Sequence, residues 1–481
     1  MNSEQLPESL HFVGVGGIGM SGLAQMCAEL GCRVSGSDRA LHDPANQRIF
    51  DALRAMGISL YPQDGSVYGH IKPDAIVYST AIEESNPDFI KAPDLPRIHR
   101  SQALASSVNA LKNKHTIAVT GTCGKTTVSS WLAETLENLG ASPGLLGGGL
   151  VNAFVSRDHA GNFKNGNGRY FVLEADESDK SLLNYQTDSA LVMNIGTDHY
   201  DKKELARIFR EFVLKGKDGV FVLEDQAFLQ MDPAALKNKN IQLFSQDFSA
   251  EKQLCGRKVR RLDSYSVRQG KVYCSFDGMP EICIPVPGRH HAVNALAVYT
   301  LLQELGYSSR AVLEAVENFH GVWRRFDYAG CITEKQVPLY DDYAHNVEKI
   351  LSCLSGARSL CNGRLFALFQ PHGFAPLKFM RQELFHALEN FLDPEDRFMM
   401  LPVYYAGGTA SFTPSSREVI QDYRSNSRIK KDCYRYADSR KEAEQWLCSK
   451  IRHGDIVLIM GARDNSLSLW AKELVRHTEN L

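Results

Sequence analysis

The chain has 481 residues, a formal net charge of −2 at pH 7, 43% hydrophobic residues and 23% charged residues. This balance is typical of a soluble globular protein, and the length is enough for about three domains of roughly 150 residues each. The sequence has no long basic or acidic block and no run of about 18 apolar residues, which argues against nucleic acid or a membrane as the partner. The eleven cysteines are scattered without a CxxC pair, and the N-terminus lacks a signal-peptide pattern, so we expect reduced thiols in a cytoplasmic protein.

The first region of the sequence alternates between strand and helix patterns. Apolar runs predict strands at residues 10–15, 32–38 and 74–82, and a helical pattern covers residues 18–30 before Gly31. This βαβ rhythm is typical of a doubly wound parallel sheet. We therefore predict a Rossmann-like α/β domain over residues 1–112.

A glycine motif, GVGGIG at residues 14–19, lies between the first predicted strand and the first predicted helix. It satisfies the GxGxxG pattern, and Asp38 ends the next strand, where a ribose-binding acid is expected. The physical requirement is only a diphosphate near a helix N-terminus, and a UDP-sugar meets it as well as NAD does. The motif by itself leaves both ligands open.

The second region carries a phosphate-loop motif, TGTCGKTT at residues 120–127, between a predicted strand at 115–120 and a predicted helix at 126–139. Glycines let backbone N–H groups turn toward phosphate oxygens, and the helix N-terminus adds a favourable dipole. In such a loop Lys125 reaches the β- and γ-phosphates of ATP, and the Thr126 hydroxyl binds Mg²⁺. The first glycine is closer to the lysine than in GxxxxGK[ST], and the alternative is a plain glycine turn before a helix.

Two further predicted strands, at residues 170–174 and 190–195, run into polar residues. The first ends at Glu174 and the second leads to His199. In a parallel sheet both ends face the edge that holds the phosphate loop, which makes Glu174 and His199 candidate metal ligands. The alternatives are a solvated acidic loop and a structural histidine.

The remaining sequence extends this α/β pattern. Residues 247–287 predict an antiparallel patch and residues 292–305 a helix, which complete a central P-loop domain at residues 113–320. A third α/β domain is predicted over residues 321–481. Its strands are expected at residues 338–343, 364–370, 397–404 and 455–460, and its helices at residues 348–358, 381–391 and 441–451.

In chain order, the segments HFVGVGGIGMSGLA, SGSD, GTCGKTT, EADESD, TDHYD, RRFD and DDYAH resemble the motifs of the Mur ligase family, and most of all those of its alanine-adding members. The resemblance covers residues 10–470. It implies a UDP-sugar domain, a central ATPase domain, and a C-terminal Rossmann-like domain that closes over ATP and brings the amino acid. It also implies an ATP- and Mg²⁺-dependent reaction of peptidoglycan precursor synthesis, in which the carboxylate of UDP-N-acetylmuramate is joined to a small amino acid, L-alanine first, through an acyl phosphate.

The resemblance also assigns roles to residues of this sequence. The UDP-sugar contacts would be Gly14, Gly16, Gly17, Gly19, Asp38 and Ser79. The ATP contacts would be Gly121, Thr122, Gly124, Lys125, Thr126, Thr127, Asn294 at the adenine, Arg325 and Asp342. The catalytic residues would be Lys125, Glu174, His199 and Arg325, and the metal ligands Thr126, Glu174 and His199. The amino-acid site would contain His345, His372 and Lys378.

The third region departs from the family pattern at the predicted amino-acid site. The usual FQPHRYTRTR reads FQPHGFAPLK at residues 369–378, so Gly373 and Pro376 stand where arginines are usual and Lys378 replaces a third arginine. In the alanine-adding members these arginines help to hold the amino-acid carboxylate, and neither Gly nor Pro replaces a bidentate guanidinium. Arg463, where the family tail reads GAG, is a candidate replacement cation. Either the acceptor amine is not L-alanine, or L-alanine is held differently.

Three other functions compete with this interpretation. A related ligase would take a peptide or another amine. An NAD-dependent oxidoreductase would need no phosphate loop, so the GTCGKTT segment argues against it. A non-catalytic relative would have lost Lys125, Thr126, Glu174 or His199, and all four are present. Lys215 is a minor candidate for the carbamylated lysine of other family members.

Overall fold

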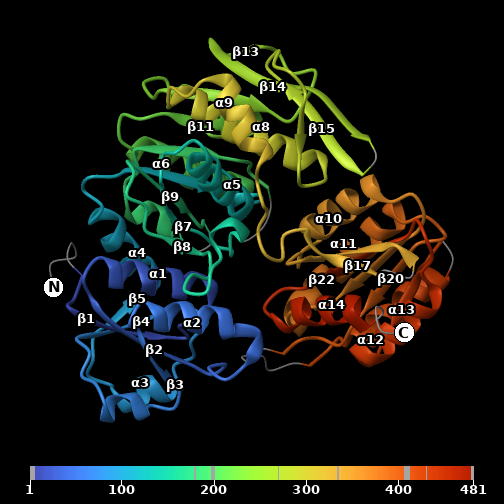
Figure 1. The fold of residues 1–481 in the computed structure, drawn as a ribbon, viewed down its shortest axis with the longest axis horizontal. Helices are drawn as coiled ribbons and strands as arrows, with labels where there is room; N and C mark the ends of the chain where they lie inside the picture. Colours follow the sequence, from blue (N-terminus) through green and yellow to red (C-terminus); the bar gives the residue numbers. More distant parts are fainter. Residues whose placement is uncertain are drawn as a thin grey trace. The chain divides into compact units, whose positions relative to one another are not determined.

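The computed structural model describes residues 6–177, 180–196, 201–268, 270–332, 335–405, 412–428 and 431–477, and it contains three sheets with helices packed on them (Figure 1). The first two sheets belong to one compact unit, and the third sheet, from Trp323 onward, belongs to a second. The α/β class predicted from the sequence is confirmed. None of the described helices is long and apolar enough to cross a membrane. The eleven cysteines are all free thiols.

The first sheet has five parallel strands in the order β3-β2-β1-β4-β5. The strand order reverses between β1 and β4, so we expect a ligand to bind beyond the carboxyl end of β1, where the glycine motif follows. The strands are β1 (Ser9–Val13), β2 (Arg33–Asp38), β3 (Ser59–Pro62), β4 (Ala75–Tyr78) and β5 (Arg97–His99). The helices are α1 (Ile18–Glu29), α2 (Gln47–Ala55), α3 (Pro87–Lys91) and α4 (Arg100–Asn109).

The strand predicted at residues 74–82 is shorter than expected. It ends at Tyr78 because residues 79–82 form a turn, in which the Ile82 N–H donates to the Ser79 carbonyl at 3.0 Å. This turn brings Ile82 against the glycine motif, since a Cβ built on Gly14 would lie 3.0 Å from its Cδ1 atom.

The second sheet has eleven strands, and its central run β12-β11-β10-β6-β9-β7 is parallel. Its strands are β6 (His115–Thr120), β7 (Gly144–Leu146), β8 (Phe163–Lys164), β9 (Tyr170–Glu174), β10 (Ser189–Val192), β11 (Phe221–Glu224), β12 (Ile241–Ser245), β13 (Gln253–Leu254), β14 (Arg257–Arg268), β15 (Lys271–Phe276) and β16 (Ile282–Ile284). Its helices are α5 (Lys125–Asn138), α6 (Lys202–Lys215), α7 (Asp225–Gln230), α8 (Arg289–Glu304) and α9 (Ser309–Glu317). Strand β6 lies between β9 and β10, so the ends of all three strands meet at one edge.

The patch predicted as antiparallel at residues 247–287 is only partly so. Strand β13 pairs antiparallel with β14, but β14 pairs parallel with β12 and thereby extends the central sheet. The physical reason is burial: Val259 of β14 packs in the same core cluster as Leu243 of β12.

The third sheet has six strands in the order β17-β18-β22-β19-β20-β21, parallel except at β17. The strands are β17 (Asp327–Ile332), β18 (Val337–Asp342), β19 (Leu365–Phe369), β20 (Arg397–Met400), β21 (Tyr434–Tyr436) and β22 (Ile456–Met460). The helices are α10 (Val347–Leu360), α11 (Phe374–Phe391), α12 (Ser416–Asn426), α13 (Arg440–Lys450) and α14 (Ser466–His477). Strands β19 and β22 are buried at every residue, as expected for inner strands covered on both faces.

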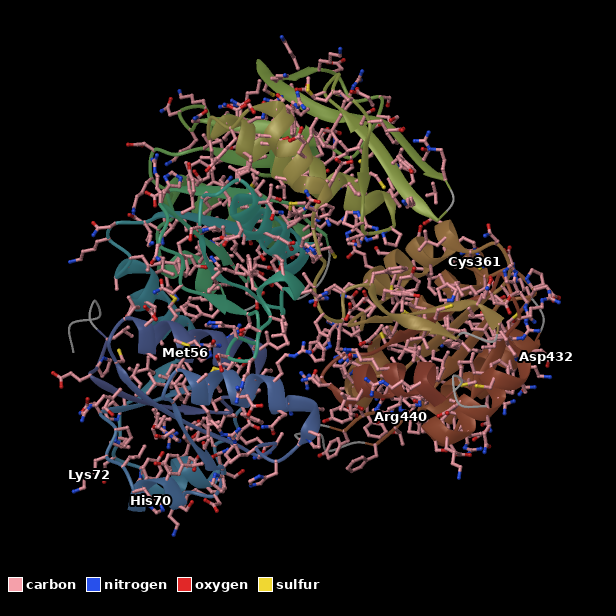
Figure 2. All side chains as sticks on the ribbon, in the orientation of Figure 1. Met56, His70, Lys72, Cys361, Asp432 and Arg440 are labelled. Carbon is pink, nitrogen blue, oxygen red and sulfur yellow. The ribbon has the colours of Figure 1, made fainter. Side chains whose placement is uncertain are left out.

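Helix α11 begins seven residues before the helix predicted at residues 381–391. Its N-cap is Gly373, so Pro376 stands in the first turn, where no intrahelical partner exists for the missing N–H. The predicted amino-acid segment is therefore largely helical, and Lys378 is exposed on this helix. Side chains fill the space between each sheet and its helices (Figure 2).

Candidate active site

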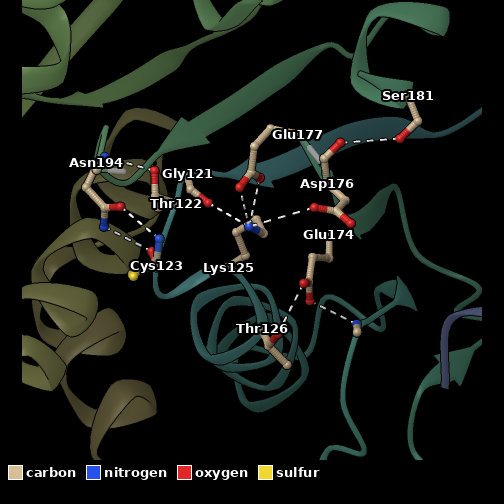
Figure 3. Close-up of polar contacts among 12 residues, drawn as sticks. Gly121, Thr122, Cys123, Lys125, Thr126, Glu174, Asp176, Glu177, Ser181 and Asn194 are labelled. Atoms are coloured by element: carbon tan, nitrogen blue, oxygen red, sulfur yellow. Dashed lines mark hydrogen bonds and ion pairs between the residues drawn. The ribbon is translucent and has the colours of Figure 1, made fainter. Parts of the chain in front are cut away.

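The phosphate loop between β6 and α5 is tied to the end of β10. The Cys123 N–H donates to the Asn194 side-chain oxygen at 2.8 Å, and the Asn194 amide donates back to the Cys123 carbonyl at 3.0 Å (Figure 3). The Thr122 hydroxyl accepts from the Gly196 N–H at 2.9 Å. These contacts fix the loop in an open turn. Asn194 was not predicted from the sequence, although it follows the apolar strand directly.

Two glycines of this loop adopt backbone conformations that other residues rarely reach. Gly121 has φ +135° and Gly124 has φ +90°. A Cβ on Gly124 would lie 3.3 Å from the Asn294 side-chain oxygen, so the buried Asn294 of α8 lies against the loop. The structure therefore brings the predicted adenine residue to the predicted phosphate site.

Lys125 is buried in a pair with Glu177. Its ammonium donates to both Glu177 oxygens, at 2.7 and 3.0 Å, and to the Gly121 carbonyl at 2.8 Å, and it lies 3.9 Å from Asp176 (Figure 3). Burial acts to lower the pKa of Lys125, but the nearby Glu177 and Asp176 carboxylates raise it above its usual range. Burial raises the pKa of Glu177, against the attraction of Lys125. Lys125, the predicted phosphate-binding lysine, is therefore charged while it is paired with Glu177.

Thr126 and Glu174 form the oxygen-rich part of the site. The Thr126 hydroxyl donates to one Glu174 oxygen at 3.1 Å, and the Gly148 N–H donates to the other at 2.9 Å (Figure 3). A hydroxyl and a carboxylate oxygen are the ligands that Mg²⁺ prefers, so these residues fit a nucleotide-bound Mg²⁺. In the part of the chain that the structure describes, no group of three or more His, Cys, Asp or Glu side chains could hold a metal by itself. His199 lies outside the described residues.

A pocket of about 250 Å³ opens between α1, α4 and the end of β9. It is lined by Gly19, Leu23, Arg100, Ser101, Leu104, Leu146, Gly147, Gly148, Glu174, Asp176 and Ser181. Arg100 brings a cation into this pocket, where its guanidinium donates to Asp176 at 3.3 Å. One pocket thus joins the end of the glycine motif to the carboxylate beside the phosphate loop.

The glycine motif is organised around Asp38. One carboxylate oxygen accepts from the Gly16 N–H at 2.8 Å and the other from the Ala40 N–H at 2.8 Å. A Cβ on Gly16 would lie 2.8 Å from Phe50 and 2.9 Å from Asp38, so no larger residue fits there. Asp38 therefore fixes the loop itself, a contact that the ribose interpretation did not predict. Gly17 is the N-cap of α1, and Ser79 begins the turn after β4.

Helix α1 is locked onto the second sheet by Asn162, a residue that the sequence analysis missed. The Asn162 amide donates to the Ser21 hydroxyl and to the Ile18 carbonyl, both at 2.8 Å. A Cβ on Gly22 would lie 2.9 Å from Leu146, so helix and sheet are in close contact. The small residues of the GMSGLA segment thus let α1 pack closely against the second sheet.

In the second unit, the first arginine of the RRFD segment is buried and the second is not. Arg324 donates to the buried Asp341 at 3.1 and 3.3 Å, and to the carbonyls of Gly461 at 2.6 Å and Asp464 at 2.8 Å. Arg325 lies over the Tyr343 ring, with 5.4 Å between guanidinium carbon and ring centroid. Sequence reasoning identified Arg325 and missed the structural Arg324.

Asp342 is held by the backbone beside Arg325. Its oxygens accept from the N–H groups of Phe326 and Ala344, both at 2.7 Å. Burial raises the pKa of Asp342, while the Arg325 charge acts to lower it. The structure thus places two predicted nucleotide residues of the third domain next to each other.

The predicted amino-acid residues His345 and His372 meet in the same unit, with ring centroids 5.1 Å apart. Burial, assisted by the Lys349 charge, lowers the pKa of His345 to about 3. Burial and the Arg463 and Lys349 charges lower the pKa of His372 to about 4. Lys349 was missed by the sequence analysis, and both imidazoles are neutral near pH 7.

Three family models match the chain in order: the Mur ligase family catalytic domain over residues 9–111, the Mur ligase middle domain over residues 119–302, and the Mur ligase glutamate ligase domain over residues 324–463. A UDP-N-acetylmuramate–L-alanine ligase of Allorhizobium ampelinum is 32% identical to the chain, over 98% of the chain and 97% of that protein. The chain belongs to the Mur ligase family.

Two further matches cover the family fold from end to end. A UDP-N-acetylmuramate–L-alanine ligase of Rhizobium etli is 32% identical, over 99% of both chains. The crystal structure of the UDP-N-acetylmuramate–alanine ligase MurC from Thermotoga maritima superposes with a TM-score of 0.77 and 25% identity, over 98% of this chain and 99% of that one. The Mur ligase resemblance seen in the motifs is therefore confirmed.

Proposed function

We propose that this Mur ligase uses ATP to join L-alanine to the carboxylate of UDP-N-acetylmuramate in peptidoglycan precursor synthesis. The observation that carries the proposal is the pocket shared by Gly19 and Glu174, because it connects a diphosphate-binding loop to a phosphate-transfer site. The names of the relatives from Allorhizobium ampelinum and Rhizobium etli support the same substrates.

The first step places the sugar carboxylate in this pocket, where it attacks the γ-phosphate of ATP and becomes an acyl phosphate. The α1 N-terminus and its glycine loop would bind the UDP diphosphate, and Arg100 would orient the carboxylate. Lys125 is already protonated and would exchange its Glu177 partner for phosphate oxygens. Catalysis then consists mainly of positioning and of cations that neutralise the transferred charge.

Thr126 and Glu174, with His199, would hold Mg²⁺ beside the nucleotide. When bound, Mg²⁺ supplies positive charge to the phosphate oxygens during transfer. Within the protein, the Gly148 N–H fixes the orientation of Glu174 and so keeps its second oxygen toward Thr126.

The second step is attack of the amine on the acyl carbon, with release of phosphate. Closure of the third domain over ATP would exclude water, which otherwise hydrolyses the acyl phosphate. Arg325, Asp342, His345 and His372 would contribute to this closed state.

A related ligase with another amine or a peptide as acceptor is the second candidate. It is favoured by one observation, the absence of arginine from residues 373–378.

Phosphate release from ATP separates these functions. The protein is supplied with UDP-N-acetylmuramate and Mg²⁺, and each amino acid and a muropeptide are tested in turn. We expect release stimulated by L-alanine, with UDP-muramoyl-alanine as product. Release stimulated only by another amine would establish the second candidate, and no stimulation by any amine would contradict both.

A further inference from the structure

Three parallel strand ends of the second unit converge on the predicted amino-acid site. Strand β22 lies between β18 and β19, with Met460 opposite Asp342 on one side and Phe369 on the other. His345, His372 and Arg463 each follow the end of one of these strands by three residues. Carboxyl ends of neighbouring parallel strands share one edge of a sheet, which is where ligands bind in such folds.

Two cations accompany the two imidazoles at this edge. The His345 Nδ1 lies 2.9 Å from the Tyr343 carbonyl and therefore carries the proton, so Nε2 accepts from the Lys349 ammonium at 3.5 Å. The His372 Nδ1 atom is buried without a hydrogen-bond partner among the described residues. Because both imidazoles are neutral near pH 7, the positive charge of this cluster comes from Lys349 and Arg463.

Arg463 is held in place by the protein although its side chain is exposed. Arg324 donates to the carbonyls of Gly461 and Asp464 on either side of it. Arg463 itself has φ +67°, a left-handed conformation that is unfavourable for a residue other than glycine and persists only where surrounding contacts impose it. No carboxylate of the described residues forms an ion pair with Arg463.

We propose that Lys349 and Arg463 bind the carboxylate of the incoming amino acid, in place of the arginines missing from residues 373–378. The inference rests on the proposed function and names its substrate class. A carboxylate bound at this edge of the sheet would accept hydrogen bonds from the two cations, and from His372 once its Nδ1 carries the proton. The site therefore takes a free α-amino acid, whose α-carboxylate is ionised. It rejects a peptide, because the α-carboxyl group of the peptide's N-terminal residue forms an amide and carries no charge.

The test compares L-alanine with L-alaninamide, which lacks the carboxylate charge. The wild-type protein should prefer L-alanine. Arg463→Gly should lower kcat/KM for L-alanine by about 10- to 100-fold, the range of one charge-assisted contact, and leave kcat/KM for L-alaninamide unchanged. Glycine adopts φ +67° freely, so the Tm of this variant should equal or exceed that of the wild type. If Arg463→Gly has a lower kcat/KM for L-alanine and a Tm at least equal to that of the wild type, the loss of activity cannot come from misfolding.

Cys255→Gly is the matched control. Cys255 is exposed in the first unit and has φ +50°, so the variant makes the same backbone change without removing a cation. Its kcat/KM for L-alanine should be that of the wild type. Lys349→Met keeps a side chain of similar length and removes the charge. This variant should lose the preference for L-alanine over L-alaninamide, as Arg463→Gly does.

Each failure has a separate signature. If wild-type protein forms no UDP-muramoyl-alanine, the proposed function fails. If it does and Arg463→Gly and Lys349→Met discriminate like the wild type, the carboxylate site is elsewhere and the inference is wrong. Loss of discrimination in Lys378→Met alone would give the role to Lys378 instead.

Discussion

The candidate site of the first unit (the first half) and that of the second unit (the second half) differ in how their cations are paired. In the first unit two cations of the candidate site already have a carboxylate: the predicted Lys125 pairs with Glu177, and Arg100, which the structure adds, pairs with Asp176. In the second unit Lys349 and Arg463 lie near neutral imidazoles, and their charges add to burial, the larger cause, in lowering the pKa of His372.

We attribute this difference to the ligand that each half is proposed to bind. ATP brings several negative charges and a cation of its own, so a site that is balanced beforehand must exchange partners when the nucleotide arrives. A free amino acid brings one carboxylate, and the charges of Lys349 and Arg463 would attract it. The comparison predicts that a variant of the first half that breaks an ion pair loses both stability and activity. A variant of the second half that removes one cation should mainly weaken binding of the amino acid.

The largest effect is expected from Lys125→Met. Loss of the phosphate-binding cation should lower kcat by about 10²–10³-fold, as for loss of one transition-state donor. The variant also leaves Glu177, whose side chain is 2% exposed, as an unpaired buried charge, which costs about 3–5 kcal/mol of the free energy of unfolding. Phosphate release and urea unfolding measure the two quantities.

The double variant Lys125→Met with Glu177→Gln separates the two effects. Removal of both charges should restore most of the stability and none of the activity. A double variant as unstable as Lys125→Met would show that Glu177 does not carry the penalty.

Arg324→Met should lower the unfolding temperature of the second unit and have little direct effect on the binding of ATP. The guanidinium is 1% exposed, and its removal leaves the buried Asp341 carboxylate without its ion-pair partner. We therefore expect the free energy of unfolding to fall by about 3–5 kcal/mol. Because Arg324 also holds the backbone around Arg463, KM for L-alanine should rise while KM for ATP stays constant. Calorimetry and steady-state kinetics give the two values, and equal increases in both KM values would contradict this separation.

Glu174→Gln tests whether Glu174, beside Thr126 in the first unit, helps to bind Mg²⁺. The amide keeps the size and the contact with Gly148 but loses the charge opposite Thr126. We expect the Mg²⁺ concentration for half-maximal activity to rise by about 10- to 100-fold, in the range found for groups that support metal ligands. Saturating Mg²⁺ should recover part of the activity, and an unchanged Mg²⁺ requirement would remove Glu174 from the metal site.

The sequence predicted the first half better than the second because nucleotide binding imposes a local pattern. A strand, two glycines in left-handed conformations and a lysine must be neighbours in the chain, so GTCGKTT identified the loop. Glu177 was hidden in an acidic run that looks like a solvated loop, and only the buried contact with Lys125 distinguishes it.

The second half depends on burial and on distant parts of the chain. Arg324 and Arg325 are chemically identical neighbours, and only the fold decides which one pairs with Asp341. Arg463 lies near enough to His372 for its charge to act on that imidazole because β22 lies between β18 and β19, an order that no local pattern reveals. The four-residue spacing of His345 and Lys349 could have indicated that their side chains lie close together. The helix begins between them, however, because Asn346 is its N-cap.

The last expected effect is a pH dependence of the free energy of unfolding in the second unit. The pKa values of His345 and His372 fall from 6.5 in the unfolded chain to about 3 and about 4. Below pH 6.5 the unfolded chain binds protons that the folded protein does not, so this stability is complete above pH 6.5 and is lost as pH falls toward 4. Each histidine contributes a slope of at most about 1.4 kcal/mol per pH unit. His345→Asn should flatten the curve of unfolding free energy between pH 6.5 and 4 relative to wild type, measured in urea, whereas an unchanged slope would mean that the imidazole is protonated in the folded protein.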